Sequence, residues 1–255
     1  MGSMSNFSGP PQVHAFDGLL FDFDGTIIDS TEGWFQEDCI LQLLLTSTSC
    51  RTAIVKHWHR IGQEIGVDPA MILVTSHGRR SIDVLKIHAP ERANWEYVSS
   101  IEGRIPKEYG SDAVEIPGAR DILNALDEAG APWAVVTSGT QALINGWLDV
   151  LKLARPKNLV VAEDVKIGKP NPQCYQLGRS RLGFDENSSM LVIEDAPSGV
   201  TAGKAAGFKV LALATTHDPT RLKQAGADWI IRDLRSFKLI KHDGQVQVEI
   251  RNCLQ

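Results

Sequence analysis

The chain has few cysteines and no long apolar run. It contains four cysteines among its 255 residues, and no two of them are spaced as C-x-x-C. Zinc motifs built on that spacing are therefore excluded, and so few cysteines do not make a disulfide framework. We expect reduced thiols in a cytoplasmic protein. No apolar stretch approaches the roughly 20 residues of a membrane-spanning helix, and no basic stretch followed by an apolar core indicates a signal peptide.

The chain also lacks an excess of positive charge. Its 26 lysine and arginine residues are outnumbered by 31 aspartate and glutamate residues, which gives a formal net charge of −5. A protein of this charge has no general attraction to nucleic acid or to anionic membranes, so we expect neither as a partner. An anionic substrate must then be attracted by a local site. No amphipathic stripe is left without a place in the predicted fold, so we expect a monomer.

From residue 115 onward, short apolar runs alternate with segments of helical periodicity. This order is typical of an α/β fold with a doubly wound parallel sheet and helices on both faces. The predicted strands lie at residues 19–21, 133–136, 159–161, 190–193, 210–213 and 229–231, and a hairpin follows around Asp243-Gly244. The core therefore spans residues 15–29 and 115–255. Residues 1–14 are mostly polar or small, so we predict a disordered N-terminal tail.

Residues 30–114 interrupt this order directly after the first strand. Their apolar residues recur at helical spacing, first in a long segment that includes residues 34–45 and then in shorter segments up to residue 108. Ser30 or Asp29 is a suitable N-cap for the first of these helices. No stretch in this region has the pattern of a buried strand, so we predict a helical insertion.

The most informative stretch covers residues 19–26. An apolar run of strand length ends there in two carboxylates, Asp22 and Asp24, and a glycine and a threonine follow. Because side chains alternate along a strand, the two carboxylates lie on one side, and a turn at Gly25 frees them at the carboxyl end. Aspartate and glycine also occur in ordinary turns, but this pattern behind an apolar run arises by chance in roughly one chain in a thousand of this length.

Polar groups follow the other predicted strands in the same way. Thr137 and Ser138 come after one strand, Lys169 lies in a Gly-Lys-Pro loop after the next, and Glu194 with Asp195 ends a third. In a doubly wound sheet, ligands bind outside the carboxyl ends of the strands. We therefore expect these side chains to gather with the carboxylates of the first strand at one edge of the sheet.

Four carboxylates in a small space repel one another unless a cation neutralises them. Oxygen ligands without histidine or cysteine indicate Mg²⁺, which usually binds one or two carboxylates together with a substrate phosphate. The same layout therefore predicts a phosphoryl ligand, for which Lys169, Thr137 and Ser138 are suitable partners. One carboxylate of the first strand can attack phosphorus, which gives an aspartyl phosphate, and the other can protonate the leaving alkoxide and later deprotonate water.

These four motifs resemble those of the haloacid dehalogenase superfamily, in order and across the whole core. The resemblance implies a phosphoric monoester hydrolase with Asp22 as the nucleophile and Asp24 as the general acid and base. It also implies an α-helical cap domain formed by residues 30–114. The phosphate ligands that it implies are Thr137, Ser138 and Lys169. The Mg²⁺ ligands that it implies are Asp22, Glu194, Asp195 and the backbone carbonyl of Asp24.

Within the superfamily, residues 194–199, 202–207 and 76–81 are similar to fungal glycerol-3-phosphate and 2-deoxyglucose-6-phosphate phosphatases. Residues 101–106 favour the glycerol-3-phosphate type, and the C-terminal segment favours the 2-deoxyglucose-6-phosphate type. The sequence therefore does not decide between these two substrates. In the cap, His77, Arg79 and Arg80 form a basic turn that could reach the hydroxyls or the phosphate of a substrate. We favour His77 and Arg80 as substrate-facing because they match the family's H-G-x-R pattern, whereas Arg79 fits a solvated surface equally well.

Four other hypotheses compete with this prediction. Related beta-phosphoglucomutases carry a histidine where this chain has Trp34, and its absence favours transfer of the phosphoryl group to water rather than a sugar phosphomutase. Asp24 argues against a dehalogenase, which lacks the second aspartate, and against a phosphorylated ATPase, which has threonine there. A non-catalytic regulatory protein that binds a phosphorylated ligand would have lost one of the charged groups, and none is missing.

Overall fold

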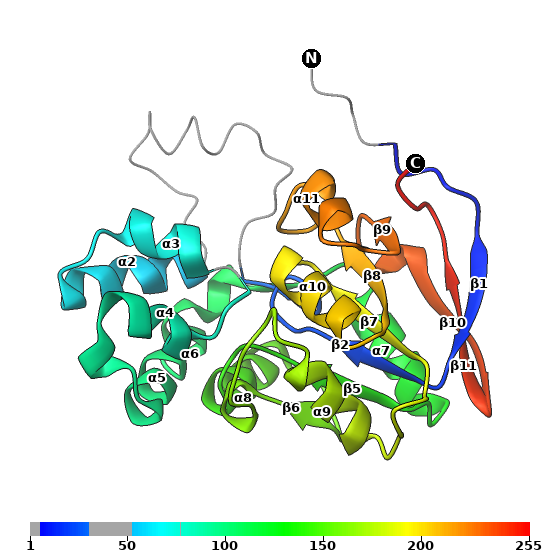
Figure 1. Cartoon of the computed structure of the whole chain (residues 1–255), viewed down its shortest axis with the longest axis horizontal. Coiled ribbons are helices and arrows are strands. Elements are labelled where there is room, and N and C mark those ends of the chain that lie inside the picture. The colour runs from blue at the N-terminus through cyan, green and yellow to red at the C-terminus, as the bar shows by residue number, and fades with distance from the viewer. Residues whose placement is uncertain (1–5, 31–52, 77) are drawn as a thin grey trace.

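The computed structural model describes residues 6–30, 53–76 and 78–255 (Figure 1). At its centre is a parallel sheet with the strand order β6-β5-β2-β7-β8-β9. Its strands are β2 (Gly18–Phe21), β5 (Trp133–Val136), β6 (Leu159–Val160), β7 (Met190–Glu194), β8 (Lys209–Leu213) and β9 (Trp229–Ile231). The predicted doubly wound sheet is therefore confirmed. The connections diverge on the two sides of β2, which places the end of β2 at the point where such folds bind ligands.

The sheet is covered on both faces because its strands are apolar at successive positions. In β2, Leu19 and Phe21 belong to one buried cluster and Leu20 belongs to another on the opposite face. The first cluster includes side chains of α7 (Ala119–Glu128) and α8 (Gln141–Leu151). The second includes side chains of α9 (Gln173–Arg181), α10 (Pro197–Ala205) and α11 (Pro219–Gln224). Two-sided burial of this kind is what continuous apolar strands predict.

A helical unit lies beside the sheet in Figure 1. It contains α2 (Ala53–Ile65), α3 (Pro69–Ser76), α4 (Ser81–His88), α5 (Trp95–Glu102) and α6 (Ile105–Tyr109), with short 3₁₀ turns η1 (Pro90–Arg92) and η2 (Gly110–Asp112). Trp58, Ile61, Leu85 and Ile101 are among the side chains of its own apolar cluster. On that ground we propose that residues 30–114 form a cap domain. The predicted helix over residues 34–45 lies outside the described residues.

Two short strands mark where the chain leaves and re-enters the core. Strand β3 (Ile28–Asp29) pairs antiparallel with β4 (Val114–Glu115). Within the insertion, the segment at residues 95–108, which reads as one helix, is divided between α5 and α6. Pro106 explains the division, because proline has no N–H to donate to the preceding turn and is accepted only in the first turn of a new helix.

The N-terminal segment is ordered further towards its start than we predicted. Strand β1 (Gln12–Phe16) pairs antiparallel with β11 (Gln245–Ile250), which in turn pairs with β10 (Phe237–Asp243). The prediction of a disordered tail up to residue 14 is therefore wrong for residues 12–14. The composition of residues 1–14 gave no sign of this strand, because its partner is a C-terminal strand that is distant in sequence.

The predicted C-terminal hairpin is confirmed, and Gly244 in its turn has a positive φ of 74°. Between β9 and β10 lies the 3₁₀ turn η4 (Leu234–Ser236), and η3 (Ala162–Asp164) follows β6. Within the described ranges, the structure has no helix that is both long and apolar enough to span a membrane.

Candidate active site

The polar residues predicted at the strand ends gather at one edge of the central sheet. Asp22 follows β2 directly, and its N–H donates to the carbonyl of Ile193 on neighbouring β7 at 2.9 Å. The chain then turns at Gly25, which has a φ of 83°. A side chain at this position would collide with the Asp195 carboxylate, so the turn requires glycine for its conformation and for its close packing.

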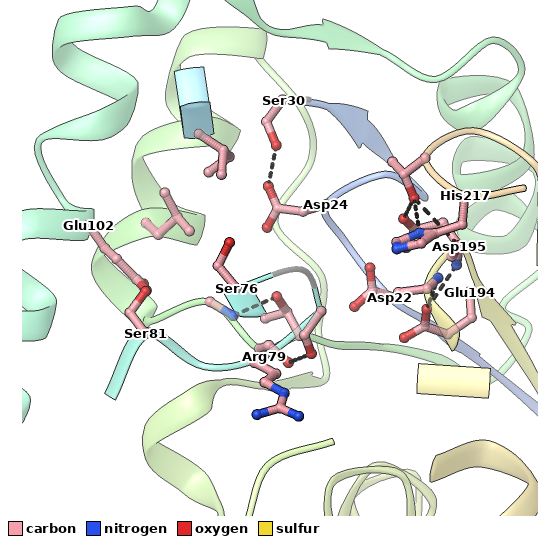
Figure 2. Close-up of a pocket in the computed structure, with 18 of the residues that line it drawn as sticks. Asp22, Asp24, Ser30, Ser76, Arg79, Ser81, Glu102, Glu194, Asp195 and His217 are labelled. Atoms are coloured by element: carbon pink, nitrogen blue, oxygen red, sulfur yellow. Dashed lines mark hydrogen bonds between the residues drawn. The ribbon is translucent and has the colours of Figure 1, made fainter. Parts of the chain in front are cut away.

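Asp22 and Asp24 lie in different surroundings. Asp22 is buried and accepts a hydrogen bond from the Lys169 ammonium at 2.5 Å. Asp24 is partly exposed and accepts a hydrogen bond from the Ser30 hydroxyl at 2.8 Å. Figure 2 shows the two carboxylates on separate sides of the turn, with Asp24 towards Ser30 and Asp22 towards Glu194 and Asp195. Two carboxylates with different partners can take different protonation states.

Lys169 is the buried cation of this edge. Its ammonium bridges Asp22 and Glu194, at 2.5 and 2.7 Å, and also donates to the carbonyl of Val136 at 3.3 Å. It lies behind Asp22 and is not among the described side chains that line the cavity. The two carboxylates raise the pKa of Lys169 well above its ordinary value, against the opposing effect of burial, so the ammonium stays charged.

Glu194 is held on both carboxylate oxygens. One oxygen accepts from Lys169 and from the Tyr175 hydroxyl at 2.9 Å, and the other accepts from the N–H groups of Asp195 and Ala196, each at 2.8 Å. Gly199 in α10 leaves the space that this carboxylate fills, because a side chain there would overlap it. Although burial opposes ionisation, these partners lower the pKa of Glu194.

Asp195 lies beside a loop that our sequence reading missed. The Thr216 hydroxyl donates to the Asp195 carboxylate, and the His217 ring is 2.9 Å from the same hydroxyl. Both residues line the cavity. They follow β8 as Thr137 follows β5. The expectation that polar residues after a strand of this sheet face the ligand would therefore have identified them if it had been applied to β8. Tyr175, in contrast, lies in a helix with no distinguishing pattern, and no sequence signal marks it.

Three carboxylates at this edge face a single ammonium. Burial raises the pKa of Asp22 to about 8 and, together with the neighbouring Glu194, raises the pKa of Asp195 well above its ordinary range. Oxygen atoms of Asp22, Glu194 and Asp195 lie within 4.8 Å of one another. A divalent cation held by these oxygens would remove the repulsion that disfavours ionisation. The donor set is therefore suited to a hard cation.

The predicted phosphate ligands after β5 have two different contacts. The Thr137 hydroxyl accepts from the N–H of Gly139 at 3.0 Å, inside the turn that leads into α8. The Ser138 hydroxyl donates to the carbonyl of Gly78 in the cap at 3.1 Å. Thr137 and Ser138 both line the cavity that holds Asp22. Ser138 therefore also joins the core to the cap.

Arg80, which we predicted to face the substrate, is not among the described residues that line the cavity. Its side chain is only 3% exposed and forms an ion pair with Asp83 at 2.7 Å. It also donates to the carbonyls of Ala162, Val165 and Lys166 in the segment that leads to Lys169. A guanidinium with these fixed partners joins the cap to the core. The H-G-x-R pattern indicated a functional arginine, but sequence alone did not give the direction of its side chain.

The structure places one of the other two residues of the basic turn, Arg79, and does not describe His77. Arg79 lines the mouth of the cavity and is exposed, and its guanidinium points away from Asp22 in Figure 2. His77 lies outside the described residues.

The cavity between core and cap has a volume of about 100 Å³. Its walls include the catalytic candidates Asp22 and Asp24 on the core side, and apolar side chains such as Trp58 and Leu143. The cap side contributes polar residues that we did not single out, namely Ser76, Ser81 and Glu102. A cavity whose walls combine apolar side chains with a few polar groups suits a small organic ligand.

Comparison with known proteins gives consistent matches. The family described as haloacid dehalogenase-like hydrolase matches residues 19–213. Glycerol-1-phosphate phosphohydrolase 1 of Saccharomyces cerevisiae is 38% identical over 92% of this chain and 89% of its own length. From the same organism, 2-deoxyglucose-6-phosphate phosphatase 1 is 31% identical over 93% of this chain and 96% of its own length.

The solved structures agree on the fold. A hydrolase from Pseudomonas syringae superimposes with a TM-score of 0.66, covering 85% of this chain and 94% of its own. Its sequence is 23% identical, so this match concerns the arrangement of the elements and not the chemistry of the site.

Proposed function

The chain belongs to the haloacid dehalogenase-like hydrolases, and on that premise we propose that it is a Mg²⁺-dependent phosphatase of small polyol or sugar phosphates. One observation carries the proposal: Asp22, paired with buried Lys169, lies in the same cavity wall as a second, differently held carboxylate, Asp24. This arrangement offers one carboxylate for attack on phosphorus and another for proton transfer.

In this proposal, Asp22 attacks phosphorus while the bond from phosphorus to the alcohol oxygen breaks. Lys169 holds the Asp22 carboxylate in place, and Asp24 gives its proton to the departing alkoxide. Although Asp24 is partly exposed, the surrounding protein removes water from its carboxylate and so raises its pKa, which favours the protonated form that this step needs. Asp24 then takes a proton from the water that cleaves the aspartyl phosphate, and free phosphate leaves. The Thr137 and Ser138 hydroxyls, which line the cavity with Asp22, bind the phosphoryl oxygens, while Lys169 stays behind Asp22 and acts through that carboxylate.

The residues present fit Mg²⁺ because the cluster consists of carboxylates and carries an excess of negative charge. Asp22, Glu194 and Asp195, with the backbone carbonyl of Asp24, would hold the ion. When bound, it would supply positive charge that stabilises the negative charge of the transferring phosphoryl group. Glu194, whose oxygens already have several donors, keeps this group of side chains in a fixed arrangement.

The substrate class is supported by the named relatives and by the cavity. The similar yeast enzymes are named for glycerol 1-phosphate and 2-deoxyglucose 6-phosphate, which are both monophosphates of polyhydroxy compounds. The cap side of the cavity carries hydroxyl and carboxylate groups that can bind the hydroxyls of such an alcohol. Glycerol phosphate is favoured of the two, because the relative named for it is the more similar, at 38% against 31% identity.

The test is a panel of phosphate esters with phosphate release as the readout. It contains glycerol 1- and 3-phosphates, 2-deoxyglucose 6-phosphate, hexitol phosphates, and glucose 1- and 6-phosphates. We expect Mg²⁺-dependent release from the small polyol phosphates, lost on chelation and restored by added Mg²⁺. Conversion of glucose 1-phosphate to glucose 6-phosphate without release would instead indicate a phosphomutase. No turnover, with binding to a partner protein, would indicate a regulatory protein.

Asp22→Asn tests the mechanism. We expect kcat to fall at least about a thousandfold, because the amide oxygen is a poor nucleophile. Asp121→Asn is the matched control, since Asp121 is an exposed aspartate on α7. Substantial activity in folded Asp22→Asn, judged by circular dichroism, would overturn the assignment of the nucleophile.

A further inference from the structure

Glu102 forms the wall of the cavity that faces the catalytic edge. It is the last residue of α5 in the cap, and its side chain is buried although it lines the cavity. Figure 2 shows Glu102 and Ser81 on one side of the pocket and Asp22, Glu194 and Asp195 on the other. A phosphoryl group bound beside Asp22 would therefore direct its alcohol towards Glu102.

The Glu102 carboxylate is fixed but retains the capacity to bind another donor. One oxygen accepts from the Ser81 hydroxyl at 2.5 Å, and the other accepts from the N–H of Thr140 at 2.7 Å. The two oxygens together offer about four acceptor positions, and the Ser81 hydroxyl with the N–H and hydroxyl of Thr140 occupies three of them, so one position is left. Thr140 is the N-cap of α8, and the positive end of this helix helps to hold a carboxylate there.

Within the described part of the chain, Glu102 has no salt-bridge partner. The adjacent arginines do not change this, because Arg80 is bound to Asp83 and to core carbonyls, and Arg79 is exposed at the mouth. A buried carboxylate without a cation is costly to maintain, as the raised pKa of Glu102, about 7, also indicates. A residue kept at such a cost beside a substrate cavity is a candidate for recognition.

We propose that Glu102 is the specificity-determining residue that binds a free hydroxyl of the alcohol and rejects substrates that carry a second anionic group. The inference rests on the proposed phosphatase function and deepens it. Hydroxyls donate to a carboxylate in charge-assisted hydrogen bonds. A carboxylate or a second phosphate in the same place would meet a like charge, and the described residues offer no buried cation beside Glu102 to neutralise it. The substrates are then monophosphates of otherwise uncharged polyols.

Two phosphate esters with the same three-carbon skeleton isolate the effect of a second anionic group. sn-Glycerol 3-phosphate ends in a hydroxymethyl group, where 3-phosphoglycerate has a carboxylate. We expect the wild type to prefer glycerol phosphate by at least 100-fold in kcat/KM. In Glu102→Gln, which keeps the size and the acceptor for Thr140, we expect this preference to fall at least tenfold because the rate with 3-phosphoglycerate rises. A merely structural role would change both rates alike.

Ser81→Ala is the matched control, because it removes a partner of Glu102 and leaves the charge. We expect it to weaken turnover of both substrates and to retain the preference. An unchanged preference in active Glu102→Gln would overturn the inference while the phosphatase function stands. If the wild type hydrolyses neither substrate nor any other phosphate ester of the panel, the proposed function itself fails.

A second measurement on the wild type decides the case if Glu102→Gln does not fold. Protonation removes the charge of Glu102, so we expect the preference to fall at least threefold between pH 8 and pH 6. The other charged groups around this end of the cavity are Asp24 after β2, Arg79 in the cap turn and Glu163, which binds the N–H of Gln141 at the start of α8. His217, across the cavity, is a further titratable group. Because 3-phosphoglycerate carries the extra charge, titration of any of these groups would change the ratio, so Ser81→Ala provides the assignment: it removes a hydrogen bond that lowers the pKa of Glu102 and should move the fall in preference to higher pH. A constant preference over this range would overturn the inference.

Discussion

The two ends of the cavity are built in different ways. At the core end, three carboxylates surround one buried ammonium, and their positions follow from neighbouring strands of one sheet. At the cap end, a single carboxylate is held by a hydroxyl and a backbone N–H, and its position follows from the packing of helices α4, α5 and α8. In the proposed function, the sheet edge supplies the charges for phosphoryl transfer, and the helices supply the surface that discriminates between alcohols.

The largest effect on stability and turnover is expected when the buried cation of the core end, Lys169, is removed. In Lys169→Met, Asp22 and Glu194 lose their shared partner, and breaking a buried ion pair in this way costs about 3–5 kcal/mol of unfolding free energy. We expect that loss in urea denaturation with chelator present, together with a fall in kcat of at least a thousandfold. Lys157→Met, at an exposed position, is the control. Unchanged stability would show that the ion pairs of this edge are not formed in solution.

Arg80 tests whether the two ends are held together as one site. In Arg80→Ala, several charge-assisted hydrogen bonds between cap and core are lost, and we expect about 3 kcal/mol less unfolding free energy. Turnover should fall by a similar factor for every substrate, because Arg80 does not touch the cavity. The adjacent Arg79→Ala should change stability by less than about 0.5 kcal/mol. A change of preference between substrates in Arg80→Ala would contradict this assignment.

The smallest expected effect concerns the stability cost of Glu102. Burial raises its pKa from 4.5 to about 7, so between these values the folded protein binds more protons than the unfolded chain. The contribution of Glu102 to stability therefore falls as pH rises through this window and is constant above it. A pKa shift of this size means that the ionised Glu102 lowers the unfolding free energy by roughly 3 kcal/mol. Glutamine avoids this cost but forms weaker hydrogen bonds, which lowers the unfolding free energy of the variant by about 1 kcal/mol.

Glu102→Gln should accordingly be more stable than the wild type by about 2 kcal/mol at pH 8, and this gain should vanish near pH 5. Urea denaturation at pH 5, 6, 7 and 8 measures the difference, and Glu128→Gln on the surface of α7 is the control. A stability difference that does not vary with pH would mean that Glu102 is not a buried charge. A pH-dependent gain in stability, together with a reduced substrate preference in the same variant, would show that Glu102 lowers the stability of the fold and raises the selectivity of the site.

The sheet could be predicted because its strands are apolar at every position and end in polar residues. Once the strands are placed, the grouping of Asp22, Lys169 and Asp195 follows from topology alone. The strand β1 could not be placed in this way, because its partner β11 lies more than 200 residues away and its own pattern is short. Local periodicity reports which residues are buried but not which distant strand they meet.

The cap was harder to predict than the core for a physical reason. Helical periodicity indicates which face of a helix is buried, but it does not determine how that helix is oriented over the sheet. Arg80 and Glu102 illustrate the difficulty. The basic turn suggested substrate binding by Arg80, and the similarity of residues 101–106 to glycerol-phosphate phosphatases indicated the segment that holds Glu102 but not the direction of its side chain. Their positions depend on the contacts of α4 and α5 with the segments that follow β5 and β6.

The short ladder between β3 and β4 has a consequence for the architecture of the chain. Asp29 pairs with Val114, so the point where the chain leaves the core and the point where it returns are neighbours. A tight two-residue turn could join them and close the core without any cap, as in a hairpin. The helical unit is therefore inserted at a site where segments of other lengths could be accommodated, and a core with a different insertion would present the same catalytic edge to another set of molecules.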